Sequence, residues 1–106
     1  MTERVQEILC ELKARLTELY GERLEKLILF GSQARGDAEP DSDIDVLVVL
    51  KGDVDVGREL WRVSEITSEI SLANRTQVTS VVMPVNHYGA GQSPFLMNVA
   101  SEGVAV

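Results

Sequence analysis

Two short groups of residues in the first half of the chain carry side chains and backbone that suit metal ions and phosphates. Gly31 and Ser32 follow one apolar stretch, and after ten intervening residues Asp43 and Asp45 open a second. A glycine-serine pair and two carboxylates one residue apart are the kinds of group that hold a metal-bound triphosphate. We therefore predict a metal-triphosphate site that these four residues share.

The two carboxylates suit a divalent metal ion. Residues two apart in a strand point to the same side and lie roughly 6.6 Å apart along the backbone, so Asp43 and Asp45 can converge at the start of the strand. Ligation by oxygen alone favours Mg²⁺ or Mn²⁺ over zinc. Because Mg²⁺ normally completes its shell with waters and substrate phosphates, ATP or another nucleoside triphosphate is the expected ligand.

Gly31 and Ser32 supply groups for phosphate. Glycine lets the backbone approach an anion closely, and the free N–H groups of the turn that begins there can bind phosphate oxygens together with the Ser32 hydroxyl. Arg35 either adds a cation to the same anion or pairs with Asp37 or Glu39. Acidic metal ligands beside a phosphate cradle imply nucleotidyl transfer, because metals neutralise the triphosphate and stabilise charge on the attacking and leaving oxygens.

The elements that must position these residues follow from periodicity and turn residues. Apolar residues at three- and four-residue steps predict a helix from about Thr2 to Tyr20, which Gly21 stops. A short buried strand is predicted over Leu27–Phe30 and one helical turn over Ser32–Arg35. Polar residues and a proline mark a loop over Gly36–Asp41.

The second half of the chain alternates helices and strands. Asp43–Leu50 is apolar on both faces apart from its carboxylates, which is typical of a central strand. Asp55 is expected to cap a helix that ends near Ala73. A third, less buried strand is predicted over Thr76–Val85, a surface loop over Tyr88–Ser93 and a last helix over Pro94–Glu102. The apolar stripe of the middle helix is predicted to consist of Val56, Leu60, Val63, Ile66 and Ile70.

This order of elements predicts an α/β (α+β) fold in which helices pack on a small mixed β-sheet. The length of 106 residues suits a single domain over 1–106 that buries roughly 60–70% of the surface of its unfolded chain. Unpaired sheet edges make a homo-oligomer conceivable, but no residue specifies a symmetry.

Composition excludes several classes of protein. A net charge of −7, with ten basic residues spread along the chain, argues against stable nucleic-acid binding by this chain alone. The single cysteine, Cys10, lies in an apolar helical pattern and suits a reducing cytosol. We find no secretory signal and no apolar run long enough to cross a bilayer, so a cytoplasmic protein without membrane association is expected.

The run LFGSQARGDAEPDSDIDVLVVL resembles the polymerase-β-like nucleotidyltransferase superfamily, most closely its minimal nucleotidyltransferase branch. The resemblance implies a nucleotidyltransferase fold, Mg²⁺ at Asp43 and Asp45, and NTP phosphates at Gly31 and Ser32. It also implies a partner, because many minimal members are encoded beside a small helical HEPN-domain protein. In such toxin-antitoxin pairs the minimal protein is an antitoxin that adenylylates its partner.

One position departs from the family. Active members usually carry a third acidic residue on the third strand, and the corresponding position here is Thr79 or Ser80. A neutral hydroxyl is a much weaker ligand for Mg²⁺ than a carboxylate. We therefore expect at least one metal ion to bind less tightly and turnover to be slow or absent.

Two functions stay open on these grounds. The first is an Mg²⁺-dependent adenylyltransferase that modifies a hydroxyl of a partner protein. The second is a catalytically weak or inactive module of the same fold that acts by complex formation. Other ionisable groups have more ordinary interpretations: Asp53 and Asp55 lie at the far end of the second strand, and His87 lies in a polar loop.

Overall fold

The structure is a computed structural model that describes residues 2–39, 42–90 and 93–106. The expected loop over Gly36–Asp41 and that over Tyr88–Ser93 each include residues outside this part, at 40–41 and 91–92. The elements in chain order are α1 (Glu3–Tyr20), the 3-10 helix η1 (Gly21–Arg23), β1 (Leu24–Phe30), α2 (Ser32–Arg35), β2 (Ile44–Leu50), α3 (Val56–Asn74), β3 (Val78–Pro84), α4 (Val85–Ala90), α5 (Pro94–Glu102) and β4 (Val104–Ala105).

The sheet is mixed, as the sequence predicts, and its strand order is β3-β2-β1-β4. Strand β2 pairs with β1 antiparallel and with β3 parallel, while β4 pairs with β1 antiparallel. The central place predicted for the second strand is confirmed, because six of its seven residues are buried. Strand β3 is less buried, also as predicted.

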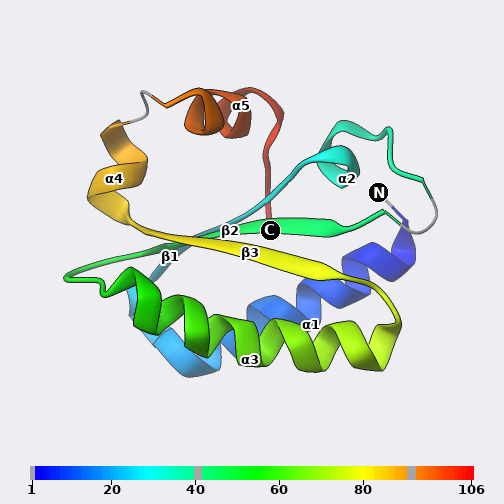
Figure 1. Cartoon of the computed structure of the whole chain (residues 1–106), viewed down its shortest axis with the longest axis horizontal. Helices are drawn as coiled ribbons and strands as arrows, with labels where there is room; N and C mark the ends of the chain where they lie inside the picture. Colours follow the sequence, from blue (N-terminus) through cyan, green and yellow to red (C-terminus); the bar gives the residue numbers. More distant parts are fainter. Residues whose placement is uncertain (1, 40–41, 91–92) are drawn as a thin grey trace.

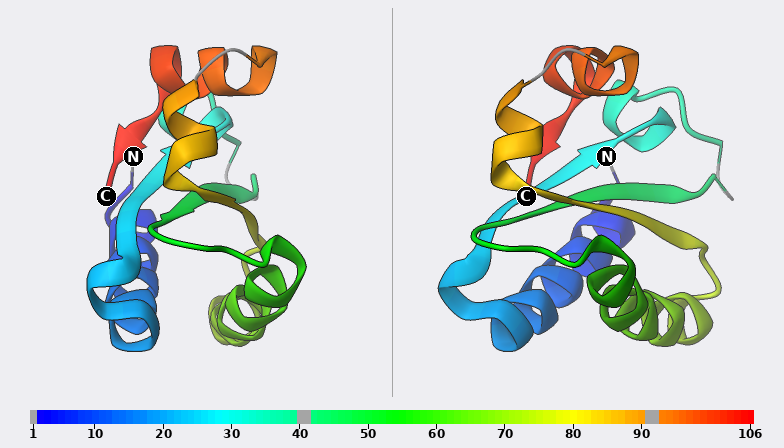
Figure 2. Two further views of the ribbon diagram at one scale, coloured as in Figure 1. Left: turned by 90° about the vertical axis from the view of Figure 1, so that its left-hand side faces the viewer. Right: turned by 60° about the vertical axis from the view of Figure 1, so that its left-hand side comes forward.

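Helices cover the two faces of the sheet unequally. The long helices α1 and α3 lie side by side beneath the sheet, and the short helices α2, α4 and α5 lie above it (Figure 1). The same three layers are visible when the molecule is turned (Figure 2). The parallel connection from β2 to β3 runs through α3, which is the usual way to join parallel strands.

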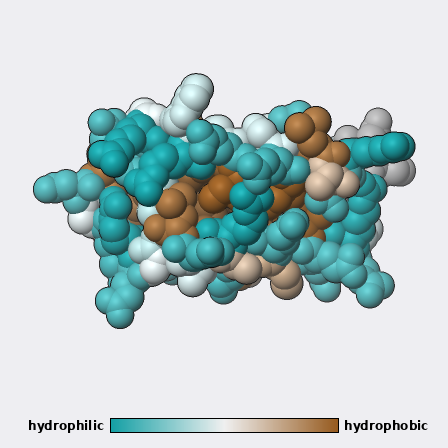
Figure 3. Space-filling model, turned by 90° about the horizontal axis from the view of Figure 1, so that it is seen from below, coloured by the Kyte–Doolittle hydropathy of each residue, from teal (hydrophilic) through white to brown (hydrophobic). Residues whose placement is uncertain are grey.

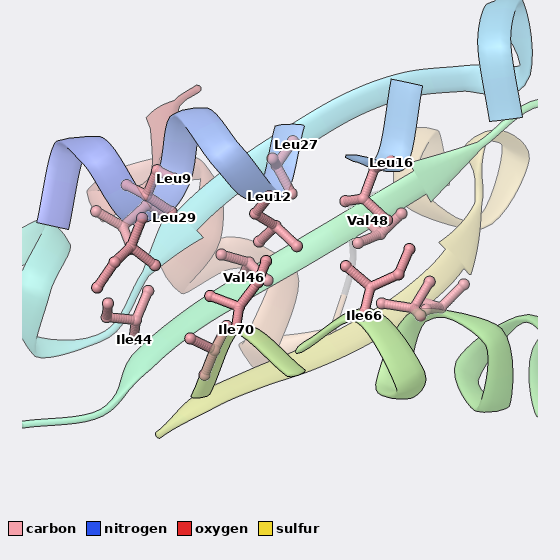
Figure 4. Close-up of a cluster of buried hydrophobic side chains, with 14 of the residues drawn as sticks. Leu9, Leu12, Leu16, Leu27, Leu29, Ile44, Val46, Val48, Ile66 and Ile70 are labelled. Atoms are coloured by element: carbon pink, nitrogen blue, oxygen red, sulfur yellow. The ribbon is translucent and has the colours of Figure 1, made fainter. Parts of the chain in front are cut away.

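The main core fills the space between the sheet and the two long helices. Leucines of α1 pack against aliphatic residues of β1, β2 and α3, and Figure 4 shows ten of them converging from these four elements. A smaller cluster on the other face joins the sheet to α5 through Leu96 and Val99. Successive β2 residues alternate between the two clusters, so Val46 and Val48 face α1 and α3, whereas Leu47 and Val49 face α5.

Local sequence explains where the helices begin. The Thr2 hydroxyl accepts from the Val5 N–H at the start of α1, and Asp55 accepts from the Arg58 N–H at the start of α3, as predicted. Gly21 ends α1 with a φ of 56°. Ser93 caps α5. Along this described part of the chain, no helix has the length and apolar content needed to cross a membrane.

The predicted stripe of α3 is wrong at its first two positions. Val63, Ile66 and Ile70 are buried, but Val56 and Leu60 are exposed. Residues 59, 63, 66, 67 and 70 make up the buried stripe, so a glutamate and a threonine take positions that hydropathy alone would not assign to a core. Figure 3 shows the face formed by the long helices, where hydrophobic surface is bordered by hydrophilic side chains.

Several boundaries differ from prediction. Strand β1 begins at Leu24 rather than at Leu27, and β3 covers Val78–Pro84 rather than Thr76–Val85. Residues 88–90 are helical in α4, not part of a loop, because Val85 and Tyr88 are one helical turn apart and both pack on the smaller core cluster. The pattern also gave no sign of the two-residue strand β4. Cys10 is exposed on α1.

Candidate active site

Three neighbouring strands bring the predicted site together at one end of the sheet. Gly31 follows directly after β1, whose last residue, Phe30, pairs with Asp45 in β2. On its other side Asp45 is in register with Thr79 in β3. The alternation along β2 places the Asp45 side chain on the side of α4 and α5, the less covered face of the sheet.

The backbone conformation at Gly31 leaves space for the Asp45 carboxylate. Its φ of +77° lies in the left-handed region that disfavours residues with a Cβ. A Cβ at this position would also stand 2.5 Å from Asp45 Oδ2, well inside van der Waals contact. The glycine therefore lets a carboxylate oxygen lie against the backbone where β1 turns into α2.

Thr79, one of the two residues expected at the position of the family's third acid, lies beside Asp45 in the sheet. Its hydroxyl donates a hydrogen bond to Asp45 Oδ1. The sequence left Thr79 and Ser80 as alternatives for this position, and the register now places Thr79 beside Asp45. Ser80 points to the opposite face, because neighbouring residues of a strand alternate.

Asp43 lies just before β2, so the strand in the structure is one residue shorter than the predicted strand. Ile44, between the two aspartates, is fully buried on the α1/α3 side, and its N–H donates to the Gln77 carbonyl at 2.9 Å. This bond fixes the start of the strand beside β3. Asp43 is exposed and Asp45 is half-buried, so the site is more open to solvent at Asp43 than at Asp45.

Ser32 begins the one-turn helix α2, as predicted. The first N–H groups of a helix have no partner within it, so those of Ser32 and Gln33 are available at the Gly31 turn. Gln33 Nε2 donates to the Ser42 carbonyl at 3.3 Å, which ties α2 to the residue preceding Asp43. The two halves of the predicted site are thus connected by a side chain as well as by strand pairing.

Arg35 forms ion pairs with two carboxylates. Its guanidinium contacts Asp37 and Glu102, each at 3.3 Å, and all three side chains are at least one-third exposed. The predicted alternative of pairing with Asp37 is thus observed, and the link to Glu102 in α5 is an addition. The hydrogen bonds to Asp37 and then to Glu102 raise the pKa of Arg35 above its ordinary value.

A cavity of about 260 Å³ adjoins Gly31 and Arg35. It lies between the end of β1 and helix α5, where Phe30 and Phe95 meet edge to face with ring centroids 5.1 Å apart. Asn98, Val99 and Glu102 complete its lining. No sequence signal pointed to this cavity, because it arises from the packing of α5 against β1.

The donor set fits a hard divalent cation. Asp43, Asp45 and the Thr79 hydroxyl offer only oxygen, which is the ligand type that Mg²⁺ and Mn²⁺ prefer. Among the described residues there is no cluster of three or more histidine, cysteine or acidic side chains that could enclose a metal ion. An ion held here therefore needs further ligands from water and substrate phosphates, which is the usual arrangement for Mg²⁺ at phosphate-transfer sites.

The other ionisable candidates lie away from this end of the sheet. Asp55 caps α3, which follows the far end of β2. Asp53 lies in the same connection, where its carbonyl accepts from Arg23. His87 is exposed on α4. The sequence pattern indicated structural roles for Asp53 and Asp55, and their positions agree with that interpretation.

Comparison with known protein families identifies the class of protein to which the chain belongs. The model of the nucleotidyltransferase domain family matches residues 9–87, which include β1, β2, β3 and every predicted site residue. The chain therefore belongs to the nucleotidyltransferase domain family, and the resemblance inferred from the sequence is confirmed. Nucleotidyl transfer is the activity of this class.

Individual relatives agree with this assignment. The chain is 31% identical over 100 residues to "Putative protein adenylyltransferase MJ0141" of Methanocaldococcus jannaschii, covering 94% of this chain and 96% of that protein. A crystal structure of a "putative nucleotidyltransferase" from Sulfolobus solfataricus superposes with a TM-score of 0.61 at 23% identity, covering 99% of this chain and 86% of that one. A crystal structure of a toxin-antitoxin with AMP-PNP gives a TM-score of 0.62 at 20% identity, covering 89% and 68%. The two structural likenesses concern the fold.

Proposed function

We propose that the protein is a cytoplasmic, Mg²⁺-dependent adenylyltransferase that moves AMP from ATP to a hydroxyl of a partner protein. The observation that carries the proposal is the arrangement of Gly31, Asp45 and Thr79 at one end of three neighbouring strands, with Asp43 and Ser32 beside them. The name of the M. jannaschii relative, a protein adenylyltransferase, supports AMP as the transferred group and a protein as the acceptor.

Each proposed site residue has a separate role. Asp43 and Asp45 would hold the metal ion, which supplies charge neutralisation of the triphosphate when it is bound. The N–H groups of the Gly31 turn and the Ser32 hydroxyl would bind phosphate oxygens. Arg35 would exchange its carboxylate partners for phosphate, since ion pairs between exposed side chains contribute little to stability.

The proposed reaction is a substitution at the α-phosphorus of ATP. The acceptor hydroxyl oxygen forms a bond to the α-phosphorus, and the bond from that phosphorus to the oxygen bridging to the β-phosphate breaks. Pyrophosphate leaves with the electron pair of that bond, and the hydroxyl proton passes to solvent. No oxidant or reductant takes part.

We further propose that the acceptor is a HEPN-like helical protein and that the pair forms a toxin-antitoxin system, in which this chain is the antitoxin. The toxin-antitoxin neighbour with AMP-PNP, an analogue of ATP, supports both a protein partner and an adenine nucleotide. Helix α3 adds support, because it exposes the large apolar side chains of Leu60, Trp61 and Leu72. Exposed apolar side chains of this kind are available for contact with a partner protein.

A second candidate function is favoured by one observation. Thr79 brings no negative charge to the position of the usual third acid, so the site holds fewer anionic metal ligands. The alternative is therefore a catalytically weak or inactive module that neutralises its partner by forming a complex.

Differently labelled ATP tests the proposed reaction. The protein is incubated with Mg²⁺ and the product of its neighbouring gene, using ATP labelled either in the α-phosphate or in the γ-phosphate. Adenylyl transfer predicts that only the α label becomes attached to the partner. Attachment of the γ label would instead indicate phosphoryl transfer, and a stable complex without attachment of either label supports the binding module.

A further inference from the structure

Thr79 is held opposite Asp45 by the parallel pairing of β2 and β3. The register runs without a shift from Ile44 and Val78 to Leu50 and Pro84, so the two residues cannot slide apart without breaking the central ladder. Both side chains lie on the sheet face that carries α4 and α5. Their contact is therefore built into the sheet rather than into a loop.

The two oxygens of Asp45 have different surroundings. Oδ1 accepts the hydrogen bond from the Thr79 hydroxyl, and Oδ2 lies in the space that a Cβ on Gly31 would fill. Threonine is branched at Cβ and has few χ1 rotamers, so its hydroxyl is a rigid donor. Thr79 thus orients the carboxylate through Oδ1, and Gly31 leaves the space that Oδ2 occupies in this orientation.

This arrangement limits the negative charge available to cations. A hydroxyl that donates its hydrogen to Asp45 contributes no charge, so Asp43 and Asp45 together carry two negative charges. Two carboxylates balance the charge of one divalent ion. A second ion at this end of the sheet would lack an anionic ligand from β3.

We propose that Thr79 is a positioning residue: it orients Asp45 so that the protein binds one divalent ion at Asp43 and Asp45, rather than two. This inference rests on the proposed metal site. Thr79 then tunes metal binding at Asp45, since hydrogen bonds to ligating carboxylates commonly tune metal affinity.

A titration with Mn²⁺ alone tests the role of the Thr79 hydroxyl in metal binding. The electron paramagnetic resonance signal of the free ion reports how much Mn²⁺ is bound. Thr79→Val removes it with little change of shape and is expected to weaken Mn²⁺ binding about 10-fold or more. Thr79→Ser keeps the hydroxyl and is expected to restore most of the affinity. Ser80→Ala is the matched control, because it removes a neighbouring hydroxyl that points to the opposite face.

Thermal unfolding of the same variants separates positioning from folding. Wild-type affinity in a folded Thr79→Val variant would overturn the proposal, as would an equal loss in Ser80→Ala. Absence of Mn²⁺ binding by the wild type would overturn it too.

The number of bound ions tests the second half of the inference. The wild type is expected to bind one Mn²⁺ per chain at this site, and Thr79→Asp, which adds a carboxylate, is expected to bind a second. Two ions in the wild type, or no additional ion in Thr79→Asp, would contradict it. If Asp45→Asn abolishes label transfer while Thr79→Val binds Mn²⁺ normally, only this inference is wrong. If Asp45→Asn leaves transfer intact, the proposed metal site is wrong, and if the wild type itself transfers no label, the proposed function is wrong.

Discussion

Gly31 is the residue at which the smallest chemical change should disturb the site most. Gly31→Ala adds one methyl group, which would stand 2.5 Å from Asp45 Oδ2 on a backbone with a φ of +77°. The carboxylate must then shift, and a shift of a metal ligand lowers activity. We expect the rate of label transfer to fall about 10-fold or more.

Gly52→Ala is the matched control for Gly31→Ala. Gly52 has nearly the same φ, +78°, but no atom lies within 4 Å of the added Cβ. Both substitutions should cost stability by about 1–2 kcal/mol through backbone strain. Equal losses of transfer in the two variants would show that strain, and not the contact with Asp45, is responsible.

Arg35 allows a second test at the scale of single residues. If it exchanges its carboxylate partners for phosphate, Arg35→Gln should raise the KM for ATP about 10-fold, the loss expected for one hydrogen bond between charged groups. Glu102→Gln removes only the link to α5 and should leave the KM unchanged or lower it. Steady-state kinetics of both variants provides the measurement, and an unchanged KM in Arg35→Gln would assign Arg35 a purely structural role.

At this scale the sequence suggested candidate site residues but not the side chains that contact them. The spacing of Gly31, Ser32, Asp43 and Asp45 was visible in the chain because these residues lie close together in the sequence. The contact between Asp45 and Thr79 spans 34 positions and depends on the register of two strands, which a single sequence does not determine. The link from Arg35 to Glu102 spans 67 positions and was missed for the same reason.

At the scale of elements, one buried polar contact joins the two long helices. The Tyr20 hydroxyl of α1 donates to Glu59 of α3 at 3.0 Å, and Arg62 donates to the same carboxylate at 3.2 Å. Glu59 is only 4% exposed, and these two hydrogen bonds provide partners for its buried carboxylate. Burial and then the hydrogen bond to Glu59 raise the pKa of Tyr20 from 10.0 to about 12.

Tyr20→Phe should therefore lower the free energy of unfolding by about 1.5–3 kcal/mol, the usual contribution of a hydrogen bond to a charged group. Below pH 10 the phenol is protonated in the folded and unfolded states, and its contribution is complete. Between pH 10 and about 12 the unfolded state loses its proton first, so the wild type loses stability as pH rises. Urea unfolding of both proteins should show their difference shrinking across this interval, and a difference independent of pH would contradict the assignment.

Elements with a clear pattern were predicted well, and the others depended on tertiary contacts. The helices α1, α3 and α5 and the strand β2 carry strong periodicity or caps. The short elements α4 and β4 have neither, and they exist because they pack on the smaller core cluster or pair with β1. Glu59 and Thr67 are buried because of hydrogen bonds that hydropathy does not indicate.

At the scale of the whole molecule, the site and the exposed apolar residues of α3 lie toward opposite faces of the sheet, so a partner that contacts α3 must extend around an edge of the sheet to place its hydroxyl in the site. The metal ligands lie toward the less covered side of the sheet, while the exposed apolar residues Trp61 and Leu72 lie on α3 beneath it. Strand β3 is at an edge of the sheet, because β2 is its one neighbour in the strand order of the described residues. Association of two copies through such an edge stays a prediction, which sedimentation of the purified protein would test.

The central claim is that the carboxylates at the start of β2 support adenylyl transfer, and one comparison tests it most directly. Asp45→Asn removes a proposed metal ligand, whereas Asp53→Asn removes an exposed carboxylate beyond the opposite end of the same strand. With Mg²⁺, α-labelled ATP and the partner protein, we predict that label transfer disappears in Asp45→Asn and persists in Asp53→Asn, while both variants still bind the partner. Transfer at the wild-type rate by Asp45→Asn would contradict the account.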